Sequence, residues 1–176
     1  YWAGSPSGGF WVTYDDGNAW TCLTDHLESL GATDVVVDMD FVTNNTLYIA
    51  TGDRDSYDNI SIGVMKSTDA GLTWNTTGLA FELHELRVIN RILQDYTNPQ
   101  VLYAATNDGV FKTSNGGDTW NELLTATEFI DMEIHPVNPQ ILYGSTDMGI
   151  VHVSTDGGYT WKSKFLETGG RRTELA

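Results

Sequence analysis

The sequence predicts an all-β fold, a β-propeller fragment of about three and a half four-stranded blades. One short pattern, Ser/Thr-x-Asp/Asn-x-Gly-x-x-Trp, occurs four times, and its tryptophans are 54, 46 and 41 residues apart. Propeller blades repeat about every 40 to 50 residues, which matches these spacings. Segments with alternating apolar residues also precede the pattern in a constant order, as expected of half-buried strands.

The repeated pattern, called the box below, has the chemistry of a tight hairpin turn. Its central Asp or Asn can accept hydrogen bonds from backbone N–H groups and hold the loop closed. The Gly two residues later suits a turn that needs positive φ, and the Trp begins the next strand and is expected to bury its ring between blades. The structural positions predicted from the four boxes are Asp15, Gly17, Trp20, Asp69, Gly71, Trp74, Asn115, Gly117, Trp120, Asp156, Gly158 and Trp161.

Four strands surround each box in the same order: an alternating strand, a Leu-Tyr strand, a Gly-led strand before the box and a Trp-led strand after it. Helix is scarce, and only residues 25–30 and 81–86 are expected to form a turn or two. This order predicts the last two strands of one blade within 8–24, full blades at about 34–79, 87–124 and 128–165, and a linker or the start of the next segment at 166–176.

Composition excludes several classes of partner. The chain has 9 Lys and Arg against 24 Asp and Glu, a formal net charge of −15, which disfavours nucleic acid and anionic membrane surfaces. No apolar run approaches the roughly 20 residues that span a bilayer. Cys22, the single cysteine, is interpreted as a small buried apolar residue. The start at Tyr1-Trp2, without Met or a leader, indicates the middle of a longer polypeptide, whose remaining blades are then the first expected partners.

The four boxes resemble those of the Asp-box (BNR-type) propellers, a group that includes sialidases, sortilin-like receptors, photosystem assembly factors and xyloglucan-cleaving hydrolases. The resemblance covers nearly the whole chain. Residues 49–81 are most similar to the repeats of large secreted bacterial proteins that use the type IX secretion system. The resemblance implies a secreted or cell-surface protein, with the secretion machinery or a protein or glycan ligand as further partners.

Two functions follow from this resemblance. The first is a non-catalytic propeller module that serves as a scaffold or binds protein or glycan, or is carried as a secretion-system cargo. The alternative is part of a propeller glycoside hydrolase, because Asp147 lies in a Thr-Asp-x-Gly segment that is similar to one in the xyloglucan-cleaving enzymes. Asp108 occupies the equivalent position one blade earlier, which favours a structural turn over a catalytic acid at both positions. A sialidase is disfavoured, because no arginine lies in an Arg-Ile-Pro context.

An acidic insertion at 52–59 breaks the repeat length and is the one place where a metal is considered. Asp53, Asp55 and Asp58 offer oxygen ligands of the kind that Ca²⁺ prefers. The spacing of an EF-hand and its terminal Glu are absent, so a solvated acidic loop is favoured and no metal is predicted. Tyr57 is the aromatic residue expected to be exposed for contact. No pattern for a cofactor, a zinc site or a serine nucleophile is present, so no cofactor is predicted.

Overall fold

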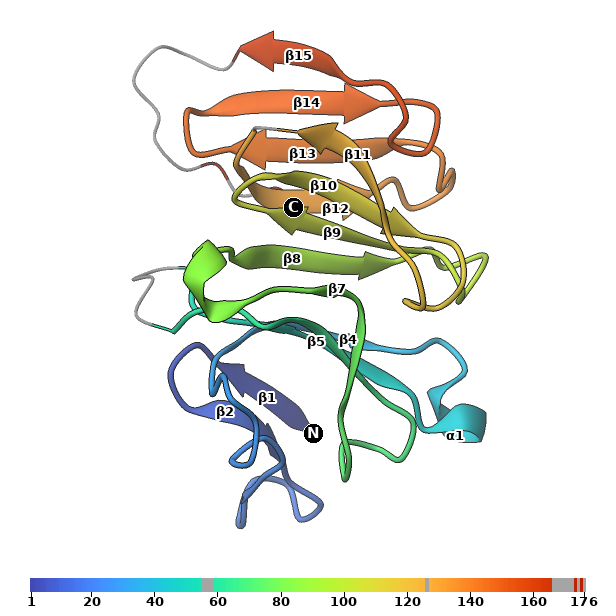
Figure 1. The fold of residues 1–176 in the computed structure, drawn as a ribbon. Coiled ribbons are helices and arrows are strands. Elements are labelled where there is room, and N and C mark those ends of the chain that lie inside the picture. The colour runs from blue at the N-terminus through green and yellow to red at the C-terminus, as the bar shows by residue number, and fades with distance from the viewer. Residues whose placement is uncertain (55–58, 126, 166–172, 174, 176) are drawn as a thin grey trace. The chain divides into compact units, whose positions relative to one another are not determined.

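The structure is a computed structural model that describes residues 1–54, 59–125, 127–165, 173 and 175. Within these residues fifteen strands form four antiparallel sheets, and in each sheet the strands follow one another in chain order (Figure 1). Three sheets have four strands and one has three, so the predicted all-β fold of four-stranded blades is confirmed. The chain divides into two compact units, Tyr1–Ile89 and Asn90–Ala176.

The first sheet contains β1 (Trp2–Ser5), β2 (Gly9–Val12) and β3 (Thr21–Cys22). The sequence predicts only the last two of these strands. Strand β1 has no apolar alternation, but it pairs with β2 from Trp2 opposite Val12 to Ser5 opposite Gly9. Pairing with β2 therefore stabilises this strand, although its own sequence has no alternating pattern.

The second sheet completes the first unit with β4 (Ala32–Val37), β5 (Leu47–Thr51), β6 (Gly63–Ser67) and β7 (Asn75–Ala80). Every residue of β5 is buried, and this strand is internal in its sheet.

Short helical turns join some of these strands. Helix α1 (Phe41–Asn44) connects β4 to β5, was not predicted, and ends at Asn45 in a left-handed conformation with φ of 53°. The 3₁₀ turn η1 (Leu83–Glu85) lies within the predicted segment 81–86, and residues 25–30 form no helix.

The second unit repeats the arrangement twice. Its first sheet contains β8 (Ile89–Gln94), which begins at the unit boundary, followed by β9 (Leu102–Thr106), β10 (Gly109–Thr113) and β11 (Asn121–Thr125). The next sheet contains β12 (Phe129–Ile134), β13 (Leu142–Thr146), β14 (Ile150–Ser154) and β15 (Lys162–Phe165).

Each unit has a core between its two sheets. In the first unit Phe10, Leu47, Ile49, Met65 and Trp74 belong to one buried cluster. In the second, the buried cluster contains Tyr103, Ala105, Val110, Phe129, Met132 and Leu142.

The box tryptophans differ in burial. Trp74 is 9% exposed, whereas Trp20 is 43% exposed, and Trp120 and Trp161 are half-buried. The expectation that each box tryptophan buries its ring therefore does not hold for Trp20. Cys22, expected to be buried, is only half-buried and lies 3.9 Å from the Thr24 hydroxyl.

Candidate functional site

The box loops are closed by their own side chains, as the second box shows. The Ser67 hydroxyl donates to Asp69 Oδ1 at 2.8 Å and accepts the backbone N–H of Gly71 at 2.8 Å. The Asp69 carboxylate then accepts both the backbone N–H of Thr73, at 2.8 Å, and its hydroxyl, at 2.6 Å. Gly71 has φ of +92°, a region that residues with a Cβ rarely adopt. Two short polar side chains thus satisfy the turn's backbone donors.

The same network recurs in the other three boxes. In each, the first Ser or Thr donates to the central Asp or Asn at 2.8 to 2.9 Å, and the Gly N–H donates back to that hydroxyl at 2.9 to 3.0 Å. The third box has Asn115 in place of the acid, and its amide oxygen accepts the Thr119 N–H at 3.0 Å. The loop therefore needs an oxygen acceptor at this position and tolerates a neutral one.

Hydrogen bonding lowers the pKa values of the box carboxyls. Hydrogen bonds from the Thr73 hydroxyl and N–H lower the pKa of Asp69 from 3.8 to about 2. Thr160 lowers the pKa of Asp156 to about 2 in the same way, and the Ala19 N–H lowers that of Asp15. These groups are therefore ionised acceptors at neutral pH and are unsuited to act as general acids.

Within each unit the box also contacts the preceding sheet through hydrogen bonds and aromatic rings. The Trp74 indole N–H donates to the Leu23 carbonyl at 3.1 Å and its ring meets Phe10 edge-on at 5.8 Å. In the second unit, the Lys112 ammonium donates to the Gly157 carbonyl of the fourth box at 3.1 Å. It also lies 5.1 Å from the ring centre of Tyr103 and 4.7 Å from that of Tyr159, within cation–π range.

Asp147, the candidate catalytic residue, is exposed in the turn between β13 and β14. In this turn the Thr146 hydroxyl accepts the Ile150 N–H at 3.3 Å. In the equivalent turn of the preceding sheet, the Thr106 hydroxyl accepts the Asp108 N–H at 3.1 Å. Asp147 is the first residue after Thr146 in a three-residue turn, whereas Asp108 is the second residue after Thr106 in a two-residue turn, so the expected equivalence of the two aspartates does not hold.

A pocket of about 400 Å³ opens beside Asp147, and Glu128, Met148, Ile150 and His152 are among its lining residues. His152 Nδ1 lies 3.2 Å from the Ser163 hydroxyl, and the His152 ring packs against Phe129 at 5.2 Å. Burial lowers the pKa of His152, which favours the neutral form of this ring. The pocket therefore joins two carboxylates to a neutral imidazole and apolar side chains.

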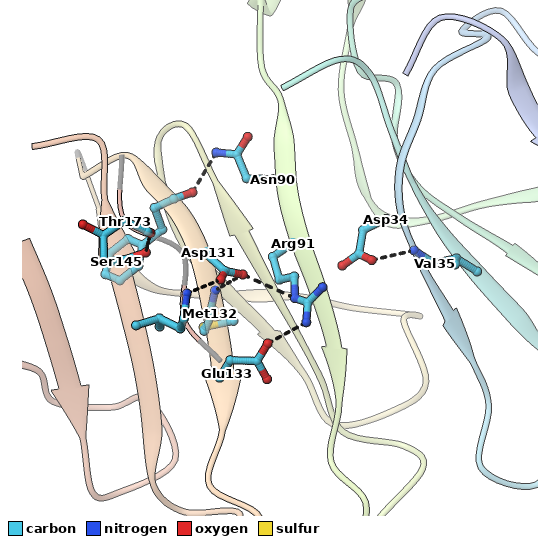
Figure 2. Close-up of polar contacts among 11 residues, drawn as sticks. Asp34, Val35, Asn90, Arg91, Asp131, Met132, Glu133, Ser145 and Thr173 are labelled. Carbon is cyan, nitrogen blue, oxygen red and sulfur yellow. Dashed lines mark hydrogen bonds and ion pairs between the residues drawn. The ribbon is translucent and has the colours of Figure 1, made fainter. Parts of the chain in front are cut away.

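A second charged cluster joins β8 to β12 (Figure 2). Arg91 donates to Glu133 Oε1 at 2.6 Å, and its Nε lies 3.5 Å from Asp131 Oδ1. The other Asp131 oxygen accepts the Leu175 N–H at 2.8 Å. Because this guanidinium is engaged by two carboxylates of its own chain, it is not available to bind an anionic substrate.

The acidic insertion is described only in part. Asp55, Tyr57 and Asp58 lie outside the described residues, as does most of 166–176. Asp53 is 2% exposed and its N–H donates to the Asn59 carbonyl at 2.8 Å, so the expectation of a solvated loop does not hold at this residue. Among the described residues no three His, Cys, Asp or Glu side chains are grouped so that they could hold a metal ion.

Sequence reasoning did not identify Glu128, Met148 or His152 as site residues. Glu128 is 19 residues from Asp147, but it directly precedes β12, whereas Asp147 directly follows β13. The start of one strand and the end of its antiparallel neighbour meet at the same edge of a sheet. The sequence signal that could have placed Glu128 beside Asp147 was therefore the strand boundaries, combined with the antiparallel pairing of the two strands.

The chain is similar to known proteins in its structure and not in its sequence. No family model matches the chain, and no curated protein sequence matches it. In the described part of the chain, no helix is long and apolar enough to cross a membrane.

Several solved structures are similar. The extracellular domain of BT4673 from B. thetaiotaomicron shares 14% identity over 98% of this chain and 22% of that one, with a TM-score of 0.72. The GH74 xyloglucanase from Xanthomonas campestris shares 18% over 92% of this chain and 28% of its own, with a TM-score of 0.69. YCF48 bound to the D1 peptide shares 15% over 92% of this chain and 48% of its own, with a TM-score of 0.56. The chain thus spans less than half the length of each, and at these identities the likeness shows the fold: the chain is a module of β-propeller blades.

Proposed function

We propose that the chain is part of an Asp-box β-propeller in a secreted or cell-surface protein, where it acts as a non-catalytic scaffold or a protein- or glycan-binding module. The four side-chain-closed boxes support this assignment. The likeness to an extracellular domain and to a propeller bound to a peptide is consistent with a binding role. In this proposal the blades lie at about 8–24, 34–79, 87–124 and 128–165, and the partners are the remaining blades of the same protein and the type IX secretion machinery.

The single observation that carries the non-catalytic role is that an aspartate recurs in the corresponding turns of successive sheets, at Asp108 and Asp147. Each follows a Leu-Tyr strand whose last threonine accepts a backbone N–H of the turn, Asp147 by one residue and Asp108 by two. A catalytic acid is needed once, at a defined distance from its partner, whereas a turn residue recurs with the repeat. The box carboxylates are likewise engaged as hydrogen-bond acceptors.

A glycoside hydrolase is the second candidate, because the pocket beside Asp147 also contains Glu128. Glycosidases use two carboxyl groups that face each other across the scissile bond. The likeness to a GH74 xyloglucanase is consistent with this alternative.

An assay for the release of reducing sugar from xyloglucan and a panel of other glucans separates the two candidates. We expect no release above the rate without enzyme, either by the wild-type protein or by the Asp147→Asn variant. Asp108→Asn serves as the matched control, because it removes the same charge from the equivalent turn. Release that Asp147→Asn abolishes and Asp108→Asn retains would establish the hydrolase and refute the non-catalytic role.

A further inference from the structure

We infer that one face of the sheet β12–β15 is the docking surface for a further blade of the same polypeptide, and that Thr173 and Leu175 are the first and third residues of that blade's first strand. The face, called the docking face below, is the one that carries Asp131, Ser145 and Val151, which lie opposite one another on β12, β13 and β14. The inference rests on the proposed role as part of a β-propeller and names the surface and the register at which the next blade joins.

The start of a first strand has a recurring contact with the sheet before it. The Thr33 hydroxyl donates to the Ile89 carbonyl at 2.7 Å, and Ile89 is the first residue of β8. The Asn90 side-chain amide donates to the Phe129 carbonyl at 2.7 Å, and Phe129 is the first residue of β12. In both places a polar side chain of the preceding sheet holds the carbonyl with which the next blade begins.

Thr173 makes the same kind of contact, since its carbonyl accepts a hydrogen bond from the Ser145 hydroxyl (Figure 2). The donors in the two earlier contacts are the second residues of β4 and β8. The second residue of β12 is Ile130, which has no side-chain donor. Ser145 supplies the donor from the neighbouring strand, where the equivalent positions of β5 and β9 hold Ala50 and Ala105.

The register of Leu175 agrees with that of Thr173. The Leu175 N–H donates to Asp131 Oδ2 at 2.8 Å, and Asp131 is the third residue of β12. The third residue of β8 is Arg91, whose Nε lies 3.5 Å from Asp131 Oδ1. Third residues of successive first strands are therefore neighbours. Thr173 also lies 44 residues after Phe129, within the usual length of a propeller blade.

The burial of the docking face indicates a surface that is only partly covered. Asp131 is 6% exposed and Ser145 is 0% exposed, although β12–β15 is the last sheet among the described residues. Val151 is half-buried, whereas the residues at its position on β2 and β10, Phe10 and Val110, are fully buried in clusters with the sheet that follows. A further sheet on this face would complete the burial of Val151.

A further blade suits the docking face better than a second copy of the chain. Thr173 and Leu175 already lie against Ser145 and Asp131. Polypeptide that continues from Leu175 is therefore tethered beside the rest of the face at a high effective concentration. A second copy has no such tether.

Hydrogen exchange of the ¹⁵N-labelled chain, followed by NMR, tests the two contacts. We expect the Leu175 amide to exchange about tenfold or more slowly than in an unstructured peptide. Ser145→Ala removes the donor to Thr173 and should speed the exchange of Leu175 about fivefold. Ser163→Ala is the matched control, because it removes an exposed hydroxyl from β15 of the same sheet, and it should leave this exchange unchanged.

An extended chain tests the register. A copy of residues 92–125, which contain β8 from its fourth residue to the end of β11, is joined directly after Leu175. We expect the midpoint of urea unfolding to rise, because the added sheet covers the docking face. The control has one glycine inserted after Leu175. A slip of one residue turns the apolar side chains of the added strand to the opposite face, so the midpoint should not rise.

Several results would overturn the inference. They are exchange of Leu175 at the rate of an unstructured peptide, equal exchange in the Ser145→Ala and Ser163→Ala variants, or equal urea midpoints of the direct and slipped extensions. A wild-type dimer whose interface covers Val151 would also overturn it and assign the face to a second copy. Because no outcome depends on sugar release, failure of this inference leaves the non-catalytic role standing, and failure of that role appears only in the hydrolysis assay.

Discussion

Replacing Trp74 with Ala is expected to lower the free energy of unfolding by about 3 to 5 kcal/mol. The indole is 9% exposed, meets Phe10 edge-on at 5.8 Å, and donates to the Leu23 carbonyl at 3.1 Å. The substitution removes a large buried ring and also leaves a buried carbonyl without its donor. Urea unfolding followed by circular dichroism measures the change.

Trp20→Ala is the matched control, because Trp20 holds the same position in the first box. Its ring is 43% exposed, so its removal should cost less than half of what the loss of Trp74 costs. Equal losses of unfolding free energy at the two positions would show that burial against the preceding sheet is not the reason why the box tryptophan stabilises the fold.

Gly144→Ala is expected to destabilise the fold by about 1 to 3 kcal/mol through overpacking. A Cβ at this position would lie 2.3 Å from Phe129 Cε1 and 2.5 Å from Cδ1, far inside contact distance. Phe129 is fully buried and also packs against Trp161 at 5.5 Å, so its ring has little room to move. The free energy of unfolding of the purified variant provides the measurement.

A double-mutant cycle tests the cause. Phe129→Leu shortens the side chain that the new methyl meets, so Gly144→Ala should cost far less in that background, with a coupling of about 1 kcal/mol or more. In the second sheet the sizes of the two residues are reversed. The small Ala32 stands at the position of Phe129, and the large Ile49 stands at the position of Gly144. Simple additivity of the two substitutions would contradict the steric explanation.

The fold could be predicted from the sequence because the box is a local device that repeats. Thr13, Ser67, Thr113 and Ser154 each bond only within the next few residues in closing their loops, so the pattern can be read from residue types and spacing. Elements without such local chemistry were missed. Strand β1 depends on pairing with β2, and α1 has neither a side-chain cap nor a buried residue.

The candidate site was predictable only in part, because its residues come together through tertiary structure. Asp147 could be found from its Thr-Asp-x-Gly segment, but Glu128 joins it only when β12 and β13 pair. The burial of the box tryptophans was also beyond the sequence. Trp20 and Trp74 have the same place in the same pattern, yet only Trp74 lies against Phe10 and Leu23 of another sheet.

The box carboxylates serve as hydrogen-bond acceptors that hold the turns. The pKa values of Asp69 and Asp156 are lowered from 3.8 to about 2 in the folded protein. A lowered folded-state pKa means that this stabilisation is complete above about pH 4 and is lost as the pH falls toward 2. Asn115 shows that a neutral amide closes the same loop.

The most direct test is the melting temperature of the Asp69→Asn/Asp156→Asn variant between pH 7 and pH 2, compared with wild type. Asp118→Asn, an exposed change in the third box loop, controls for loss of charge alone. We predict that the variant folds at pH 7. Between pH 4 and pH 2 its melting temperature should fall by less than that of wild type, whereas the melting temperature of the control should fall by as much as that of wild type. A variant that is unfolded at pH 7, or one that loses as much as wild type in acid, would contradict the claim.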